Sequence, residues 1–146
     1  MRLTRNFLLR EFTASRTAKR LGIANAPSDR QIDNLRRLCL SLLQPIRDRY
    51  DSPVIITSGY RCPELNEAVG GVADSFHTTG EAADFYVAGE PSAIHVFNTI
   101  CAEKWKYDEA ILYPDEHRLH VAVTGTNRQQ QLVEEDGDYV DRETYF

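Results

Sequence analysis

Apolar residues recur at helical spacing in the segment "SDRQIDNLRRLCLSLLQPIRDRY", residues 28–50. The recurring positions are Ile32, Leu35, Leu38, Cys39, Leu42 and Ile46. Intervals of three and four place these side chains on one face of an α-helix. Ser28 followed by Gln31 is a capping-box signal, so we expect the helix to begin there. Pro45 lies inside the pattern and should end or kink the helix.

Three shorter segments also favour helix. In "FTASRTAKRLGI" a helix would begin at Thr13 or Ser15 and end near Gly22. The segment "CPELNEAVGG" predicts a short helix closed by its two glycines. The segment "PSAIHVFNTICAEKW" has a proline near its start, which suits a first helical turn. Its expected apolar stripe comprises Ile94, Phe97, Ile100 and Cys101.

Strand patterns occupy the rest of the chain. "VIITSGY" is a β-branched run typical of a buried strand. In "EAADFYVAG" two sets of residues alternate, as in a strand: Ala83, Phe85 and Val87 on one face, and Ala82, Asp84 and Tyr86 on the other. "DEAILYP" and "RLHVAVTG" predict paired strands around the loop "PDEH". Asp136-Gly137 signals a peripheral hairpin, with a frayed acidic end as the alternative. Helices mixed with antiparallel strands indicate an α+β fold.

Composition narrows the class of protein. The chain has 146 residues, 42% of them hydrophobic and 27% charged, which is typical of one globular domain. Its net charge is −5, and no Lys/Arg block is interleaved with aromatic residues, so we do not expect nucleic acid as a partner. No apolar run approaches the ~20 residues of a membrane helix, and no signal peptide is visible. The three cysteines lack CxxC spacing, which favours reduced thiols in a protein made in the cytoplasm.

The stretch "DSFHTTGEAAD" contains the first candidate metal ligands, His77 and Asp84. On one helix these side chains would stand about 10.5 Å apart along the axis, too far for shared ligation. A turn at Gly80, which can adopt dihedrals closed to other residues, could instead fold His77 back toward a strand that carries Asp84.

The strand "RLHVAV" supplies the best third ligand, His120. Period 2 places Leu119 and Val121 toward the core and His120 on the opposite face. Asp84 and His120 would each lie beside a small alanine, which leaves room for an ion. Of the other two histidines, His95 is expected to be a structural residue of a helix and His117 lies in a polar loop.

Three motifs in order resemble the zinc D-Ala-D-Ala peptidases of the M15 family. The S-x-H-x-x-G-x-A-x-D pattern is matched from Ser75 to Asp84, the SGYR pattern at Ser58–Arg61, and the final H-V strand at His120. The segment "EFTASRTA" is similar to the start of the short, phage-like branch of this family. The resemblance covers roughly residues 7–124 and implies a hedgehog/DD-peptidase-like fold with a central antiparallel sheet and helices packed on one side. Residues 1–125 would form this domain, and residues 126–146 its C-terminal hairpin or acidic tail.

The resemblance also implies roles for individual residues. His77, Asp84 and His120 would bind Zn²⁺. Arg61 would meet carbonyl or carboxylate oxygens of the substrate, and Tyr60 would contribute to substrate binding. Ser75 would hydrogen-bond substrate or fix its loop.

The residue at the position expected for the general base differs from the family pattern. Relatives often place Glu or Asp three residues before the last histidine ligand, where this chain has His117. If the strand extends backwards, period 2 puts Glu116 on the face of His120. A histidine with a pKa of about 6.5 could also accept the proton of water. We favour Glu116 over His117.

The sequence therefore predicts a zinc-dependent peptidase that hydrolyses stem or cross-link peptides of peptidoglycan, as a D,D-carboxypeptidase or an endopeptidase. The alternative is a noncatalytic metal-binding or wall-binding module of a phage or mobile element. We expect a monomer that acts in the periplasm or cell wall after phage-type release.

Overall fold

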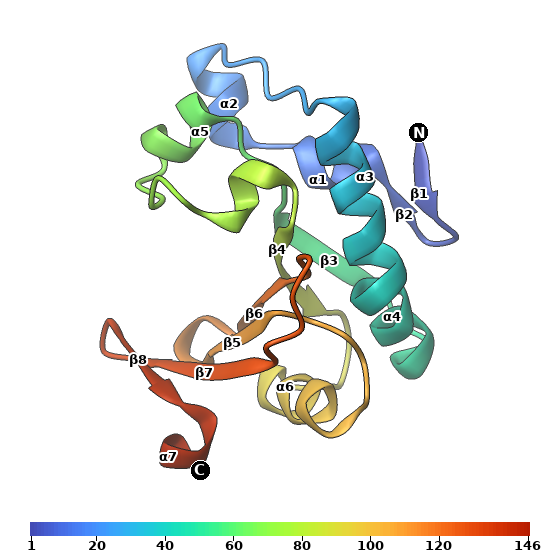
Figure 1. Cartoon of the computed structure of the whole chain (residues 1–146), viewed down its shortest axis with the longest axis vertical. Coiled ribbons are helices and arrows are strands. Elements are labelled where there is room, and N and C mark those ends of the chain that lie inside the picture. Colours follow the sequence, from blue (N-terminus) through green and yellow to red (C-terminus); the bar gives the residue numbers. More distant parts are fainter.

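The structure is a computed structural model that describes all residues, Met1–Phe146, as an α+β fold (Figure 1). The strands are β1 (Arg2–Thr4), β2 (Phe7–Leu8), β3 (Val54–Ser58), β4 (Ala82–Val87), β5 (Glu109–Tyr113), β6 (Arg118–Ala122), β7 (Gln130–Glu135) and β8 (Asp138–Asp141). The α-helices are α1 (Leu9–Thr13), α2 (Arg16–Leu21), α3 (Asp29–Leu38), α4 (Gln44–Tyr50), α5 (Pro63–Ala68), α6 (Ala93–Ala102) and α7 (Arg142–Tyr145). A π-helical turn, η1 (Cys39–Leu43), and two 3₁₀ turns, η2 (Phe76–Thr79) and η3 (Pro114–Glu116), complete the chain.

Six strands form the main sheet in the order β3-β4-β6-β5-β7-β8. The sheet is mixed, because β5 and β7 run parallel while every other pair is antiparallel. The predicted central antiparallel sheet is formed by β3, β4, β6 and β5, and the parallel strand β7 is added at the free side of β5. Strand β6 already has a neighbour on each side, so the chain that follows it crosses to the open edge of β5.

Hydrogen bonds to buried Asp108 fix this crossover. Arg128 donates to both carboxylate oxygens of Asp108, at 2.9 and 2.8 Å, and Thr126 donates a further hydrogen bond. Beyond the crossover, the Asp136-Gly137 hairpin turn is confirmed between β7 and β8, with positive φ at both turn residues. Val133 of this hairpin is fully buried, so the segment is part of the sheet and not a frayed tail.

The long helical segment begins as predicted, with a reciprocal capping box between Ser28 and Gln31. The helical segment continues past Pro45 to Tyr50, but its α-helical hydrogen bonding changes to a π-helical turn, Cys39–Leu43, just before that residue. The π-helical turn lets Gln44 N–H bond to the Cys39 carbonyl, after which Pro45 stands in the first turn of α4. A missing N–H costs little in that position, which explains why the helix continues.

Helices cover one face of the sheet. Helix α6 contacts β4, β5 and β6, and its Phe97 shares one core cluster with Phe85 and Leu119 of the strands. The buried stripe of α6 includes Val96, whereas Ile94, expected to be buried, is exposed. The opposite face of β4 and β6 is thereby left free for polar residues.

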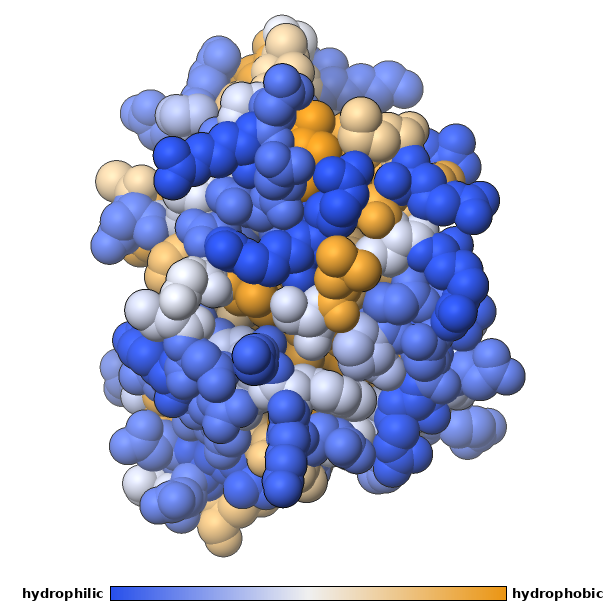
Figure 2. Space-filling model, turned by 45° about the vertical axis from the view of Figure 1, so that its right-hand side comes forward, coloured by the Kyte–Doolittle hydropathy of each residue, from blue (hydrophilic) through white to orange (hydrophobic).

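Surface hydropathy is ordinary for a globular domain. The face shown in Figure 2 is largely hydrophilic, with hydrophobic residues in small separate patches. None of the helices has the length and apolar character needed to cross a bilayer.

Candidate metal centre

A tight 3₁₀ turn positions His77. Ser75 Oγ accepts the His77 backbone N–H at 3.2 Å and so caps η2. Gly80 ends the turn with φ of +76°, a conformation that L side chains rarely adopt. A Cβ on Gly80 would also lie 2.6 Å from the Gln31 carbonyl oxygen. The predicted turn at Gly80 is thus confirmed, and it brings His77 back over β4.

Asp84 and His120 face each other across neighbouring strands. They are directly paired in the antiparallel register of β4 and β6, and Ala82 pairs with Ala122 two positions away. The small alanine side chains leave space next to the polar pair. The strand positions predicted from period 2 are therefore confirmed.

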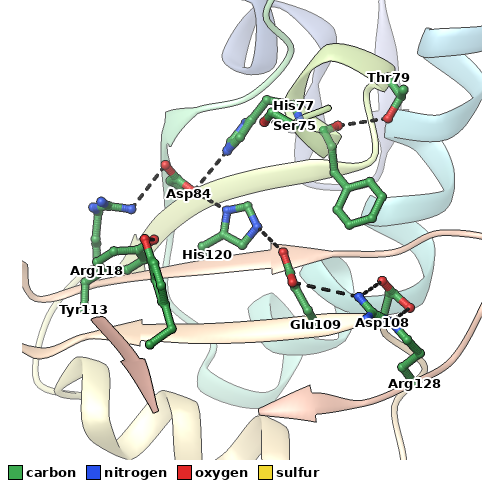
Figure 3. A network of polar contacts seen from close by, with 12 residues as sticks. Ser75, His77, Thr79, Asp84, Asp108, Glu109, Tyr113, Arg118, His120 and Arg128 are labelled. Carbon is green, nitrogen blue, oxygen red and sulfur yellow. Dashed lines mark hydrogen bonds and ion pairs between the residues drawn. The ribbon is translucent and has the colours of Figure 1, made fainter. Parts of the chain in front are cut away.

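The donor atoms of His77, Asp84 and His120 all lie within 4.8 Å of one another. Asp84 Oδ1 is 3.2 Å from His77 Nε2 and 2.8 Å from His120 Nδ1. Figure 3 shows the Asp84 carboxylate between the two imidazole rings, with Arg118 on its other side at 3.2 Å. Three side chains from two strands and one turn thus converge on a single point.

Hydrogen bonds to the far side of each ring show that the donor set fits a cation. His77 Nδ1–H donates to the Gly59 carbonyl at 2.7 Å, which leaves Nε2 facing Asp84 Oδ1 at 3.2 Å. Both nitrogens of His120 face carboxylate oxygens, from Asp84 at 2.8 Å and Glu109 at 3.0 Å. Such an arrangement requires positive charge, supplied by extra protons or by a metal ion. Two imidazoles and a carboxylate are suitable ligands for Zn²⁺.

Glu109 is the site residue that the sequence reasoning missed. It lies on β5, and its carboxylate accepts from His120 Nε2, the nitrogen that points away from Asp84. A metal-ligating histidine usually donates its second N–H to such a partner, which fixes its tautomer and orientation. The alternation in "DEAILY" could have indicated Glu109. Ala110 and Leu112 are buried in the core, so Glu109 lies on the opposite face of the sheet, the same face that carries His120 on β6.

The pKa values reflect this network. Burial by itself raises the pKa of Asp84, but hydrogen bonds from His120 and His77 outweigh it and hold the pKa well below its ordinary value. Burial by itself lowers the pKa of His120, but Asp84 and Glu109 outweigh it and raise the pKa to about 9. The Asp84 and Glu109 carboxylates thus favour positive charge at the His120 ring.

Arg61 and Ser75 lie beside the triad. Arg61 donates to Ser75 Oγ at 3.4 Å, and its buried Nε–H has no hydrogen-bond partner. Burial lowers the pKa of Arg61, and the nearby Asp84 carboxylate opposes this effect. The hydroxyl of Ser75 caps its own turn, which supports the loop-fixing role, and its contact with substrate stays a prediction. Tyr60 is only 4% exposed and belongs to the core cluster, so its substrate role also stays a prediction.

The two candidates for the general base occupy different places. Glu116 accepts from Arg118 Nε at 2.7 Å, and Arg118 in turn pairs with Asp84. Its side chain is 56% exposed. His117 has φ of +50° and lines a separate cavity with Leu119 and residues of the β4–α6 connection. The structure therefore links Glu116 to the triad through one arginine and does not bring His117 to it.

An α+β domain with three convergent protein ligands is typical of a metal-dependent enzyme, since catalytic zinc sites keep a fourth position for water. The family model described as Peptidase M15 matches residues 5–122, and the chain therefore belongs to the peptidase M15 family. A comparison with curated protein sequences finds no match. Family membership confirms the resemblance inferred from the three motifs and supports a metallopeptidase with a peptide substrate.

Proposed function

We propose that the protein is a zinc-dependent peptidase that hydrolyses stem or cross-link peptides of peptidoglycan, as a D-Ala-D-Ala carboxypeptidase or an endopeptidase. The convergence of His77, Asp84 and His120 within 4.8 Å carries this proposal. A bound Zn²⁺ would lower the pKa of a coordinated water toward ~7 and polarise the scissile carbonyl.

The protein residues have separate roles in this proposal. The Gly59 carbonyl and the Glu109 carboxylate hold the two imidazole rings in the required tautomers. Arg61 offers a permanent positive charge and an unpartnered N–H beside the triad. Negative charge that develops on the carbonyl oxygen would be stabilised there.

Glu116 is our candidate for the group that accepts the proton of the attacking water. It would have to leave Arg118, which holds it in this structure at 2.7 Å. Glu116→Gln should lower kcat by about 10²–10⁴-fold while zinc content stays unchanged. His117→Gln serves as the matched variant and should retain activity. A fully active Glu116→Gln enzyme would remove Glu116 from this role.

Cleavage of purified muropeptides by the zinc-loaded protein, followed by mass spectrometry, tests the activity itself. We expect release of D-alanine or of a shortened stem peptide, and loss of that product with a chelator. The ion pair that occupies Glu116 favours a second candidate, a metal-binding module without catalysis. Zinc-loaded protein that binds muropeptides and cleaves none would support this second function.

We also propose that the protein acts on the wall from the periplasm or from outside, after phage-type release. A peptidoglycan substrate lies beyond the cytoplasmic membrane, which is the reason for this proposal. Fractionation of the producing cells tests it. Protein confined to the cytosol, in cells without a phage or mobile element, would contradict it.

A further inference from the structure

The two carboxylate oxygens of Asp84 have different surroundings. Oδ1 lies 3.2 Å from His77 Nε2 and 2.8 Å from His120 Nδ1, so it faces the point where the three donor atoms meet. Oδ2 faces the guanidinium of Arg118, whose Nη1 is 3.2 Å away (Figure 3). The side chain of Asp84 is 14% exposed, so salt screens this ion pair less than a pair on the open surface.

Two further contacts hold the guanidinium of Arg118 in place. Its Nε–H donates to the Glu116 carboxylate at 2.7 Å. Its central carbon lies 3.7 Å from the centre of the Tyr113 ring, on the residue paired with Arg118 across β5 and β6. A planar guanidinium can lie over an aromatic face while its edge donates to carboxylates, which an ammonium cannot do. The group is thus fixed in one plane, with one nitrogen toward Asp84.

The C-terminal hairpin supports this arrangement. The hydroxyl groups of Tyr113 and Tyr139 are hydrogen-bonded at 3.0 Å, and the two rings meet edge to face with their centroids 6.1 Å apart. Tyr139 lies on β8, beyond residues 5–122 that match the family model. A continuous row of contacts therefore runs from the hairpin through Tyr113 and Arg118 to Asp84.

We propose that Arg118 is a positioning residue of the metal centre, which the C-terminal hairpin holds against Asp84 Oδ2 through the tyrosine pair. The inference rests on the proposed zinc site and concerns how Asp84 would bind the ion. With Oδ2 engaged by Arg118, the carboxylate presents Oδ1 alone, in the orientation that faces both imidazoles. Outer partners that fix the orientation of a ligand increase metal affinity.

The zinc affinity of Arg118→Gln distinguishes orientation from charge. A guanidinium repels a nearby dication, so loss of the charge alone should strengthen zinc binding. Loss of orientation should weaken it, and we expect about tenfold weaker binding in competition with a chromophoric chelator. Arg118→Lys should not restore the affinity, because an ammonium keeps the charge without the planar fork. Arg36→Gln, which loses an ion pair with Asp33 on α3, should bind zinc as the wild type does.

A second variant acts at a distance from the ligands. Tyr139→Phe removes the hydroxyl that contacts Tyr113 and leaves the side chains of Arg118 and Asp84 in place. We expect the Nε–H of Arg118 to exchange with water about tenfold faster in nitrogen NMR, as for loss of one hydrogen bond from a local network. Tyr145→Phe, which removes a hydroxyl from α7, is the matched control and should leave this exchange unchanged.

Each result bears on one part of the inference. Zinc affinity that is unchanged or higher in Arg118→Gln, or fully restored in Arg118→Lys, would overturn the positioning role. Unchanged exchange of the Arg118 Nε–H in Tyr139→Phe would overturn the part assigned to the hairpin.

Muropeptide cleavage separates this inference from the proposed function. Zinc binding that depends on Arg118, in a protein that cleaves no muropeptide, would leave the positioning role intact and contradict the peptidase. Cleavage by a protein whose zinc affinity does not depend on Arg118 would do the reverse.

Discussion

On the helix-covered face of β4 and β6, Phe85 and Leu119 are buried among apolar neighbours. The opposite face of the same strand pair carries Asp84 and His120 directly across from each other. The first face stabilises the fold by removing apolar surface from water. The second gathers polar and charged groups that hydrogen-bond to one another and are placed to hold a cation. One strand pair thus separates stability from chemistry by the alternation of its side chains, and substitutions on each face should affect different measurements.

The largest expected effect is on the polar face. His120→Ala removes one of the three proposed ligands and should weaken zinc binding by more than the roughly 100-fold that loss of an outer partner causes. Competition with a chromophoric chelator measures the affinity. His95→Ala, which removes an exposed histidine of α6, should bind zinc as the wild type does. Undiminished zinc affinity in His120→Ala would contradict the assigned ligand set.

The next effect is on the apolar face. Phe85→Ala should lower the free energy of unfolding by about 3–5 kcal/mol, because it leaves a cavity in the core. Denaturant titration of the metal-free protein measures this change. The neighbouring Tyr86 is 42% exposed, and Tyr86→Ala should cost less than about 1 kcal/mol. Equal losses for the two variants would show that the faces are not divided as described.

Glu109 also lies on the polar face, but it contacts His120 and is not one of the three proposed ligands. It therefore tests whether residues around the ligands contribute to zinc binding. Glu109→Ala should weaken zinc binding by about 10–100-fold, and Glu109→Gln by less, since an amide oxygen can still accept from His120. Nitrogen NMR of the His120 ring provides a second readout, because Glu109→Ala should lose the Nε2–H tautomer that the Glu109 carboxylate stabilises. Glu135→Ala, at the exposed end of β7, serves as the control. An unchanged tautomer and affinity in Glu109→Ala would exclude the positioning role.

A smaller effect is expected at the crossover, away from both faces. The hydrogen bonds from Arg128 hold the pKa of Asp108 below its usual value, and Asp108→Asn should destabilise the fold by about 1–2 kcal/mol at neutral pH. A carboxyl with a lowered folded pKa contributes stability above its unfolded pKa of about 3.9, and this contribution is lost as pH falls through the folded pKa.

Urea unfolding of the wild type and Asp108→Asn between pH 3 and 8 tests this dependence. The difference between the two proteins should be constant above about pH 5 and shrink in more acidic solution. A difference that grows on acidification would have the wrong sign and would contradict the role of the Asp108 carboxylate.

Local patterns were sufficient to predict most elements and the convergence of the three candidate ligands. Period 2 placed Asp84 and His120 on one face, and the turn signal at Gly80 placed His77 above them. These features depend on a few neighbouring residues and on backbone conformation. They can therefore be predicted from a single sequence.

Features that depend on distant contacts were not predicted. The parallel position of β7 depends on the occupied flanks of β6. The continuation of the helix past Pro45 is a local feature, but it depends on a π-helical turn that apolar periodicity does not indicate. Glu109 was missed because its role depends on the register between β5 and β6. The general base stays a prediction for the same reason, since Glu116 and His117 belong to a turn whose contacts local periodicity does not determine.

Metal analysis of the purified native protein tests the central claim most directly. We predict one zinc per chain, bound by the His77, Asp84 and His120 donors that lie within 4.8 Å of one another. X-ray absorption of the same sample should show nitrogen and oxygen ligands without sulfur, because no cysteine belongs to the cluster. Protein that remains metal-free after incubation with zinc, or a sulfur ligand in the spectrum, would contradict the assignment.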